Sequence, residues 1–296
     1  MTYNMSDIPD DLRQYFVRAE IGLEATPEAF IAELVAVFRE VRRVLRDDGT
    51  LWVVIGDSYA STAGGYSDTG SRGVTAVIGA KTQAAVRKGS CRKPPEGLKP
   101  KDLIGIPWML AFALRADGWY LRQDIIWHKP NPMPESVTDR CTKAHEYVFL
   151  LSKSARYYYD AGAIKEPAIH EGRVVKASGG AAKNALKGQF GQTAAGFTKH
   201  DTIVTDRNKR SVWTVATQPY SGAHFATFPP ALIEPCILAG CPIGGTVLDP
   251  FGGAGTTGLV ADRLQRSAIL IELNPAYAAI ASDRIADDAP LFGAAS

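Results

Sequence analysis

The stretch TVLDPFGGAGTTGLVADRLQRSAILIEL, residues 246–273, decides the fold. The apolar run at 246–251 predicts a short strand, and Gly253, Gly255 and Gly258 follow it directly. A helix is expected to begin near 258, and AILIEL (268–273) predicts a second strand. Glycines between a strand and a helix let the backbone approach a nucleotide, and the helix N-terminus then faces that ligand. The stretch therefore predicts a nucleotide-binding strand–turn–helix–strand unit.

Two carboxylates in this stretch narrow the choice of ligand. Glu272 lies at the end of the second strand, where an acid can accept hydrogen bonds from both ribose hydroxyls of an adenosine. Both NAD and S-adenosylmethionine carry that group. Asp249, just before the glycines, would repel a pyrophosphate but could hold the ammonium of a methionine moiety. The sequence therefore favours S-adenosylmethionine, with an NAD-dependent oxidoreductase as the alternative.

The rest of the chain supplies the other elements of an α/β sheet. Residues 27–46 predict an amphipathic helix, with Thr26 as N-cap and Pro27 at the first helical position. Two stretches without periodicity, 60–100 and 161–217, are expected to be irregular. Few residues follow Glu272, so the remaining strands must come from upstream, which is a circularly permuted order. Further helices are expected at 104–119, 228–240 and 275–285, and strands at 51–57, 120–129 and 145–154.

These residues, in this order, resemble the permuted beta group of amino-DNA methyltransferases. The resemblance rests on VFREVRRVLRDDGTLWVVIGDSYA (37–60), DIIWHKPNPMPESVTDRCTKAHEYVFLLSKSARYYYD (124–160), HFATFPPALIEPCILAGCPIGGTVLDPFGGAGTTGLVA (224–261) and ILIELNPAYAAIA (269–281). It implies a circularly permuted, Rossmann-like methyltransferase sheet with an inserted irregular DNA-recognition region. It further implies methyl transfer from S-adenosylmethionine to adenine N6 or cytosine N4 of double-stranded DNA. The implied parts are a catalytic half at 1–160, including the loop 60–100, a target-recognition region at 161–217 and a cofactor-binding half at 218–296.

The resemblance also implies the site residues. The expected cofactor-binding residues are Asp249, Phe251, Gly252, Gly253, Gly255, Thr256, Thr257, Glu272, Asn274, His224, Phe225, Ala226, Thr227, Phe228, Asp57 and Ser58. Thr227 could instead cap the helix 228–240. Thr256 and Thr257 could instead cap the helix that follows the glycine turn. The expected DNA-binding residues are Trp127, His128, Lys129, Asn131, Lys183, Lys187, Arg207, Lys209 and Arg210. An aromatic slot with hydrogen-bonding groups is what a flipped base requires. No metal site is expected.

One family signature is missing from the sequence. Amino-DNA methyltransferases carry an Asp, Asn or Ser followed by Pro-Pro and an aromatic, which positions the exocyclic amine of the target base. The only Pro-Pro pairs, Pro94-Pro95 and Pro229-Pro230, do not fit that pattern. Either the signature lies upstream of Met1 in a longer protein, or the chain is a catalytically impaired relative that binds cofactor and DNA. The chain as given is accordingly expected to be weakly active or inactive, and the target base and recognition sequence stay open.

Charge, cysteine usage and hydropathy agree with a DNA-binding protein of the cytosol. The formal net charge is +2, from 33 basic and 31 acidic residues. It conceals two basic stretches, 81–101 with seven basic residues and one acid, and 151–217 with eleven basic residues and five acids. Such stretches suit a polyanionic partner, although solvated loops would look the same.

Four scattered cysteines without a CxxC pattern argue against disulfide scaffolds and zinc ribbons. No apolar run reaches the roughly 18 residues of a membrane span, and no signal peptide is expected.

Overall fold

The computed structural model describes residues 21–60, 97–168, 173–175, 202–218 and 227–288. The chain forms two compact units, one from residues 1–160 with 211–296 and one from residues 161–210. In the described part of the chain, no helix is both long and apolar enough to cross a membrane.

The first unit contains a four-stranded mixed sheet. Its strand order is β1 (Thr50–Ile55), β3 (His145–Ser152), β2 (Tyr120–His128) and β8 (Val212–Thr214). Strand β3 runs antiparallel to both neighbours, while β2 and β8 are parallel. Successive β3 side chains point to opposite faces, so one strand contributes to two cores. The segment 161–217 was predicted to be irregular, and this was wrong for five short strands, among them β8, whose Trp213 is buried in a hydrophobic core.

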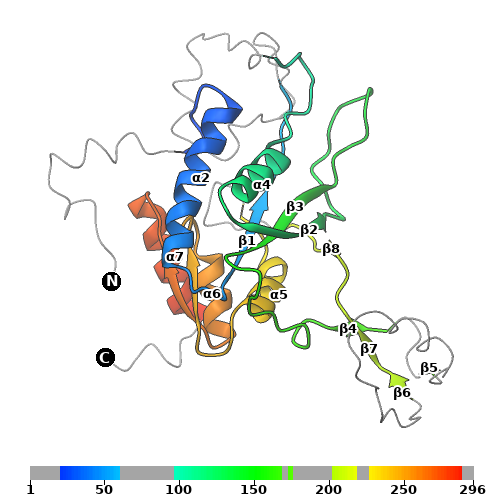
Figure 1. Ribbon diagram of the computed structural model, residues 1–296. Coiled ribbons are helices and arrows are strands. Elements are labelled where there is room, and N and C mark those ends of the chain that lie inside the picture. The colour runs from blue at the N-terminus through cyan, green and yellow to red at the C-terminus, as the bar shows by residue number, and fades with distance from the viewer. Residues whose placement is uncertain (1–20, 61–96, 169–172, 176–201, 219–226, 289–296) are drawn as a thin grey trace, which may run out of the picture. The chain divides into compact units, whose positions relative to one another are not determined.

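Helices cover both faces of this sheet (Figure 1). Helices α2 (Pro27–Val44) and α4 (Ile106–Ala116) pack on one face, against a core that includes Phe149 and Leu151. Helix α5 (Pro230–Gly240) packs on the other face, where Val148 joins a second core. Helix α2 begins as its sequence predicts, because the hydroxyl of Thr26 accepts a hydrogen bond from the backbone N–H of Ala29 at 3.2 Å.

The glycine-rich stretch folds as the predicted unit. Strand β9 (Thr246–Asp249) leads through the turn into α6 (Thr256–Arg263), then to β10 (Ser267–Leu270) and α7 (Pro275–Asp288). Strands β9 and β10 are parallel. The helix begins two residues earlier than expected, and the second strand ends before Glu272. The α/β fold class is confirmed, and the circular permutation stays a prediction.

The strands of the first unit form two sheets rather than one. Among the described residues, β1 pairs only with β3, and β9 pairs only with β10. Leu248 of β9 nevertheless packs against the core formed with α2 and α4. Strands β1 and β9 therefore contribute to one core, while each has one edge without a ladder partner in the described chain.

The second unit contains two short antiparallel pairs. Strand β4 (Glu166–Pro167) pairs with β7 (Asp206–Arg207), and β5 (Arg173–Val175) pairs with β6 (Thr202–Val204). The carboxylate of Glu166 accepts hydrogen bonds from Arg207 at 2.9 Å and from Arg210 at 2.7 Å. One acid thus holds two of the predicted DNA-binding cations within this unit.

Candidate active site

The backbone of the glycine turn doubles back at the end of β9. Gly253 and Gly255 have φ values of 49° and 74°, in the left-handed region that glycine adopts without strain. The N–H of Gly252 donates to the carbonyl of Ile271 at 2.8 Å, which joins the turn to the chain after β10. Gly255 is the N-cap of α6 and has no side chain with which to cap it. The turn therefore presents the N-terminus of α6 beside the two predicted carboxylates.

Both carboxylates brace the turn. Asp249 accepts hydrogen bonds from the backbone N–H of Phe251 at 2.9 Å and from the hydroxyl of Thr257. Glu272 accepts from the backbone N–H of Gly253 at 2.8 Å and from that of Asn274 at 2.8 Å. A carboxylate has about four lone-pair sites, so each acid can still accept from a ligand hydroxyl or ammonium. The structure thus brings Asp249, the last residue of β9, and Glu272, which follows β10, to the same turn.

The threonines and Asn274 make internal contacts. Thr256 and Thr257 are both buried. The hydroxyl of Thr257 donates to Asp249, while that of Thr256 accepts from the guanidinium of Arg284 at 2.9 Å. Asn274 accepts from the backbone N–H of Ala276 at 3.0 Å and so caps the start of α7. These three residues therefore shape the turn and its flanking helices in this structure.

Arg284 is a turn-supporting residue that sequence reasoning missed. Its Nη1 donates to the carbonyl of Ala254 at 3.1 Å as well as to Thr256. It reaches the turn from α7, 28 residues beyond Thr256 in the chain. An arginine in a helix of ordinary composition gives no local signal, so only the fold reveals this contact.

Phe251 is the aromatic residue of the turn. It is 46% exposed, and its ring packs edge-on against Phe38 of α2 with centroids 6.2 Å apart. An exposed aromatic face beside a turn can contact a flat apolar group such as an adenine.

Asp57 and Ser58 follow β1 as predicted. The carboxylate of Asp57 binds backbone N–H groups at the start of α4. Its Oδ1 accepts hydrogen bonds from the backbone N–H groups of Ser58 at 2.9 Å, Gly105 at 2.9 Å and Ile106 at 3.1 Å. Gly105 is the N-cap of α4 and has no capping side chain of its own. Asp57 therefore caps α4 from a different part of the chain.

The predicted segment before α5 is described only in part. His224, Phe225 and Ala226 lie outside the described residues. Phe228 is half-buried and packs against two of the hydrophobic cores. The suggestion that Thr227 caps α5 was wrong, because Pro229 occupies the N-cap position and the helix has no side-chain cap.

Four of the predicted DNA-binding residues lie at the end of β2. Trp127 is 3% exposed, and its indole N–H donates to the carbonyl of Val215 at 2.8 Å. This burial corrects the prediction of a direct DNA contact, because the ring is part of a core. Lys129 lies over that ring at 4.2 Å from its centroid and forms an ion pair with Glu146. The Nδ1 of His128 lies 3.1 Å from the hydroxyl of Thr214.

A charged cluster surrounds this strand end. Burial lowers the pKa of the Lys143 ammonium, although the nearby carboxylates of Asp57 and Glu146 act in the opposite direction. The sequence around Lys143 has no motif, so its position was missed. Lys183 and Lys187 lie outside the described residues, whereas Arg207, Lys209 and Arg210 belong to the second unit.

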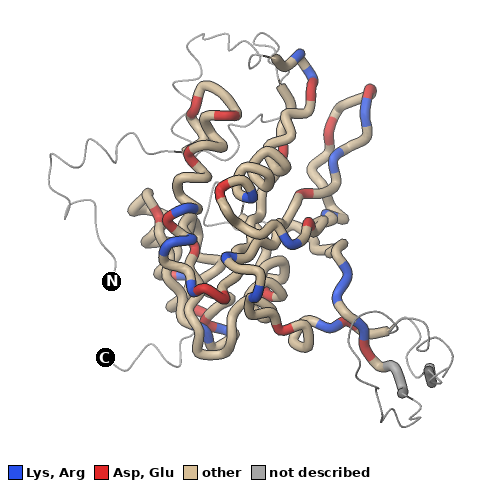
Figure 2. Tube along the Cα trace, in the orientation of Figure 1, with Lys and Arg blue, Asp and Glu red and all other residues tan. Residues whose placement is uncertain are grey.

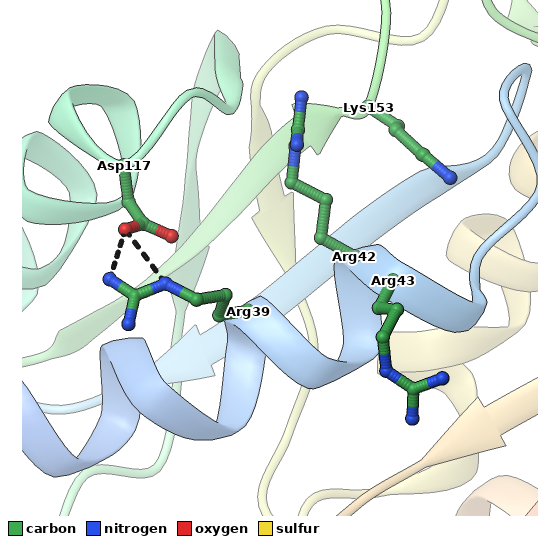
Figure 3. Close-up of a pocket in the computed structure, with 5 residues that line it drawn as sticks. All are labelled: Arg39, Arg42, Arg43, Asp117 and Lys153. Carbon is green, nitrogen blue, oxygen red and sulfur yellow. Dashed lines mark hydrogen bonds and ion pairs between the residues drawn. The ribbon is translucent and has the colours of Figure 1, made fainter.

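A basic pocket lies on the first unit, beside the C-terminal part of α2 (Figure 3). Its volume is about 430 Å³, and Asp117 in its wall pairs with Arg39. The Nε of Arg42 is buried and has no hydrogen-bond partner among the described residues. The lining residues are Arg39, Arg42, Arg43, Asp117 and Lys153. Sequence analysis missed this pocket, because helix α2 alternates these cations with its apolar face. No His, Cys, Asp or Glu grouping suited to a metal ion occurs in the described part of the chain.

Comparison with known proteins assigns the family. A family model described as DNA methylase, for N6 and N4 methyltransferases, matches residues 2–283. The chain belongs to this DNA methylase family. It is 47% identical over 275 residues to the type II methyltransferase M.SmaI of Serratia marcescens, an alignment that covers 93% of the chain and 80% of the relative. It is 48% identical over 274 residues to M.Cfr9I of Citrobacter freundii, covering 93% of the chain and 77% of that relative.

Solved structures show the same fold for this DNA methylase. A Thermus thermophilus protein assigned as a DNA modification methylase, solved with S-adenosyl-L-methionine, matches with a TM-score of 0.52 at 23% identity. The match covers 90% of the chain and 80% of that protein. The cytosine-N4-specific PvuII DNA methyltransferase matches with a TM-score of 0.55 at 17% identity, covering 88% and 76%. At these identities the likeness concerns the fold.

Proposed function

We propose that this DNA methylase binds S-adenosylmethionine at the glycine turn and transfers its methyl group to an exocyclic amine, adenine N6 or cytosine N4, of double-stranded DNA. The observation that carries the proposal is the pair of carboxylates on the turn, Asp249 and Glu272, in a chain of this family. Asp249 holds the ammonium, Glu272 holds the ribose hydroxyls, and Phe251 contacts the adenine. When bound, the cofactor supplies the methyl group. The cofactor site is completed by residues 224–228, which precede α5, and by Asp57 and Ser58.

The DNA side of the proposal rests on the end of β2 and on the second unit. His128, Lys129 and Asn131 contact DNA near the target base, with Trp127 supporting Lys129 from below. The region 161–217 reads the target, and its Lys183, Lys187, Arg207, Lys209 and Arg210 bind phosphates. The half 1–160 forms the part of the active site that holds the target base. The half 218–296 forms the part that binds the cofactor. The protein acts in the cytoplasm as part of a restriction-modification system.

Calorimetry with S-adenosylhomocysteine and with NAD tests the cofactor assignment. We expect S-adenosylhomocysteine to bind and NAD not to. Asp249→Asn keeps the hydrogen bond to Phe251 but removes the charge, and should weaken binding by about 10- to 100-fold, the value of a charged hydrogen bond. Asp262→Ala, an exposed aspartate of α6, is the matched control. Equal affinity of Asp249→Asn and Asp262→Ala would remove Asp249 from the site, and binding of NAD instead would favour an oxidoreductase.

The absence of a fitting Pro-Pro-aromatic signature in residues 1–296 leads to a separate expectation. The chain should bind S-adenosylhomocysteine and DNA yet transfer a tritiated methyl group to DNA only weakly. Rapid transfer would show that another segment positions the amine.

DNA affinity should fall steeply with salt as phosphate contacts are screened, and a flat salt response would count against DNA as the partner.

A further inference from the structure

The loop between β2 and β3, residues 129–144, carries a conspicuous apolar side chain. Met133 is 78% exposed, the highest value among the large apolar side chains of the described residues. Pro132 and Pro134 flank it, and Pro130 stands at the start of the loop. Proline fixes φ near −65°, so this segment has little conformational freedom to lose on binding. A long apolar side chain held on a stiff segment can enter a gap in a partner without a large loss of conformational freedom.

Side-chain contacts hold the loop at several points. The side-chain amide of Asn131 donates to the carbonyl of Thr217 at 3.3 Å and accepts from the N–H of the same residue at 3.0 Å. Farther along, Arg140 pairs with Glu135 and lies 4.0 Å from the ring centroid of Tyr59. These contacts tie the loop to the segment after β8 and to the segment after β1.

The loop also carries charged residues of both signs, namely Lys129, Glu135, Asp139, Arg140 and Lys143. It extends away from the sheet, and both basic and acidic residues occur along it (Figures 1 and 2). Lys129 and Lys143 lie at its two ends, and Asp139 within it pairs with Lys101 of a neighbouring segment. The loop leaves the sheet at the strand end where the proposed target-base residues are located. Met133 is therefore presented from the side of the proposed DNA contact.

We propose that Met133 is a wedge that inserts into the base stack of duplex DNA and fills the space left by the flipped target nucleotide. This rests on the proposed function, because an enzyme that modifies a base amine inside a duplex must first extrude that base. Unstacking is costly, and an apolar side chain inserted between bases offsets it. Methionine suits this role because its unbranched thioether adapts to an irregular gap.

The test uses the full chain with S-adenosylhomocysteine and a short duplex that the wild-type protein selects from a random-sequence pool. Fluorescent analogues, 2-aminopurine for adenine and pyrrolocytosine for cytosine, replace one base at a time and report unstacking. Wild type should produce a fluorescence rise at one position. Met133→Ala should lose most of that rise and bind the duplex about ten- to a hundredfold more weakly, as expected for one buried methionine side chain. Met133→Leu should restore both, within about threefold in affinity.

Ile243→Ala is the matched control, since Ile243 is 72% exposed and lies in the turn between α5 and β9. It should leave both the fluorescence and the affinity unchanged. If wild type selects a duplex and Met133→Ala matches it in both measurements, the wedge is excluded while the proposed function stands. If wild type selects no duplex from the pool, the proposed function itself fails, and the wedge with it.

Discussion

Replacing Gly255 by alanine tests whether the glycine turn is shaped by packing as well as by backbone conformation. Gly255 has a φ of 74°, and a Cβ built on it would lie 2.8 Å from the Cβ of Ala281 in α7 and 3.0 Å from its Cα. Gly244 has the same φ of 74°, yet its Cβ would meet no heavy atom within 4 Å. The two substitutions share the backbone strain and differ in the contact with α7.

The expected magnitudes follow from these two terms. A left-handed φ costs an alanine about 1–2 kcal/mol, and the reduced entropy of the unfolded chain returns about 0.4–1 kcal/mol. Gly244→Ala should therefore lower the free energy of unfolding by about 0–1.5 kcal/mol. Gly255→Ala must also displace the backbone of α7, and overpacking of this kind costs about 1–3 kcal/mol. The free energy of unfolding should therefore fall by about 1–4.5 kcal/mol in total.

Urea unfolding of wild type and both variants measures the difference, since a shift of midpoint at constant slope reports stability. Calorimetry with S-adenosylhomocysteine adds a functional measurement: Gly255→Ala should bind more weakly, and Gly244→Ala should bind as wild type does. Equal stability losses in the two variants would refute the packing argument. Unchanged cofactor affinity of a folded Gly255→Ala would show that displacement of α7 leaves the site intact.

Substitutions at three further positions test contacts that the structure shows. Asp57→Ala leaves the first N–H groups of α4 without their acceptor and should lower the free energy of unfolding by about 1–3 kcal/mol in urea, whereas Asp57→Asn should lose less. Arg284→Lys cannot bridge the glycine turn and should weaken S-adenosylhomocysteine binding in calorimetry while circular dichroism stays unchanged. The hydrogen bond from Arg263 lowers the pKa of Asp288 below its usual value near 3.8. This pair stabilises the fold above about pH 4, by less than about 1 kcal/mol, and the contribution disappears as pH falls through the lowered pKa. Asp288→Asn should therefore differ from wild type at pH 7 and converge with it in acid.

For each of these variants, one result would contradict the expected outcome. Asp57→Ala with wild-type stability would mean that solvent replaces the cap of α4. An Arg284→Lys protein with wild-type cofactor affinity would reduce Arg284 to a packing residue. A stability difference for Asp288→Asn that persists at low pH would assign the effect to something other than the ion pair.

The positions of the regular elements were predictable from the sequence. Helical spacing and the cap at Thr26 placed α2, and the glycine signature placed β9, α6 and β10 within a few residues. These signals are local, because a helix needs an apolar stripe and a turn with positive φ needs glycine. The strand β8 was missed, because three residues within a long polar stretch have no detectable period.

The sequence by itself determined the chemistry of the candidate site: the glycine turn, the acids Asp249 and Glu272, and the stiff proline loop after β2. Only the tertiary structure decided how those parts are supported and which side chains are exposed. It showed that Trp127 is buried while Met133 is exposed, and that Asp57 and Arg284 hold distant backbone groups. The physical reason is that burial and hydrogen bonds between remote segments depend on how the elements pack. The sequence pattern of a single segment does not predict how that segment packs against a remote one.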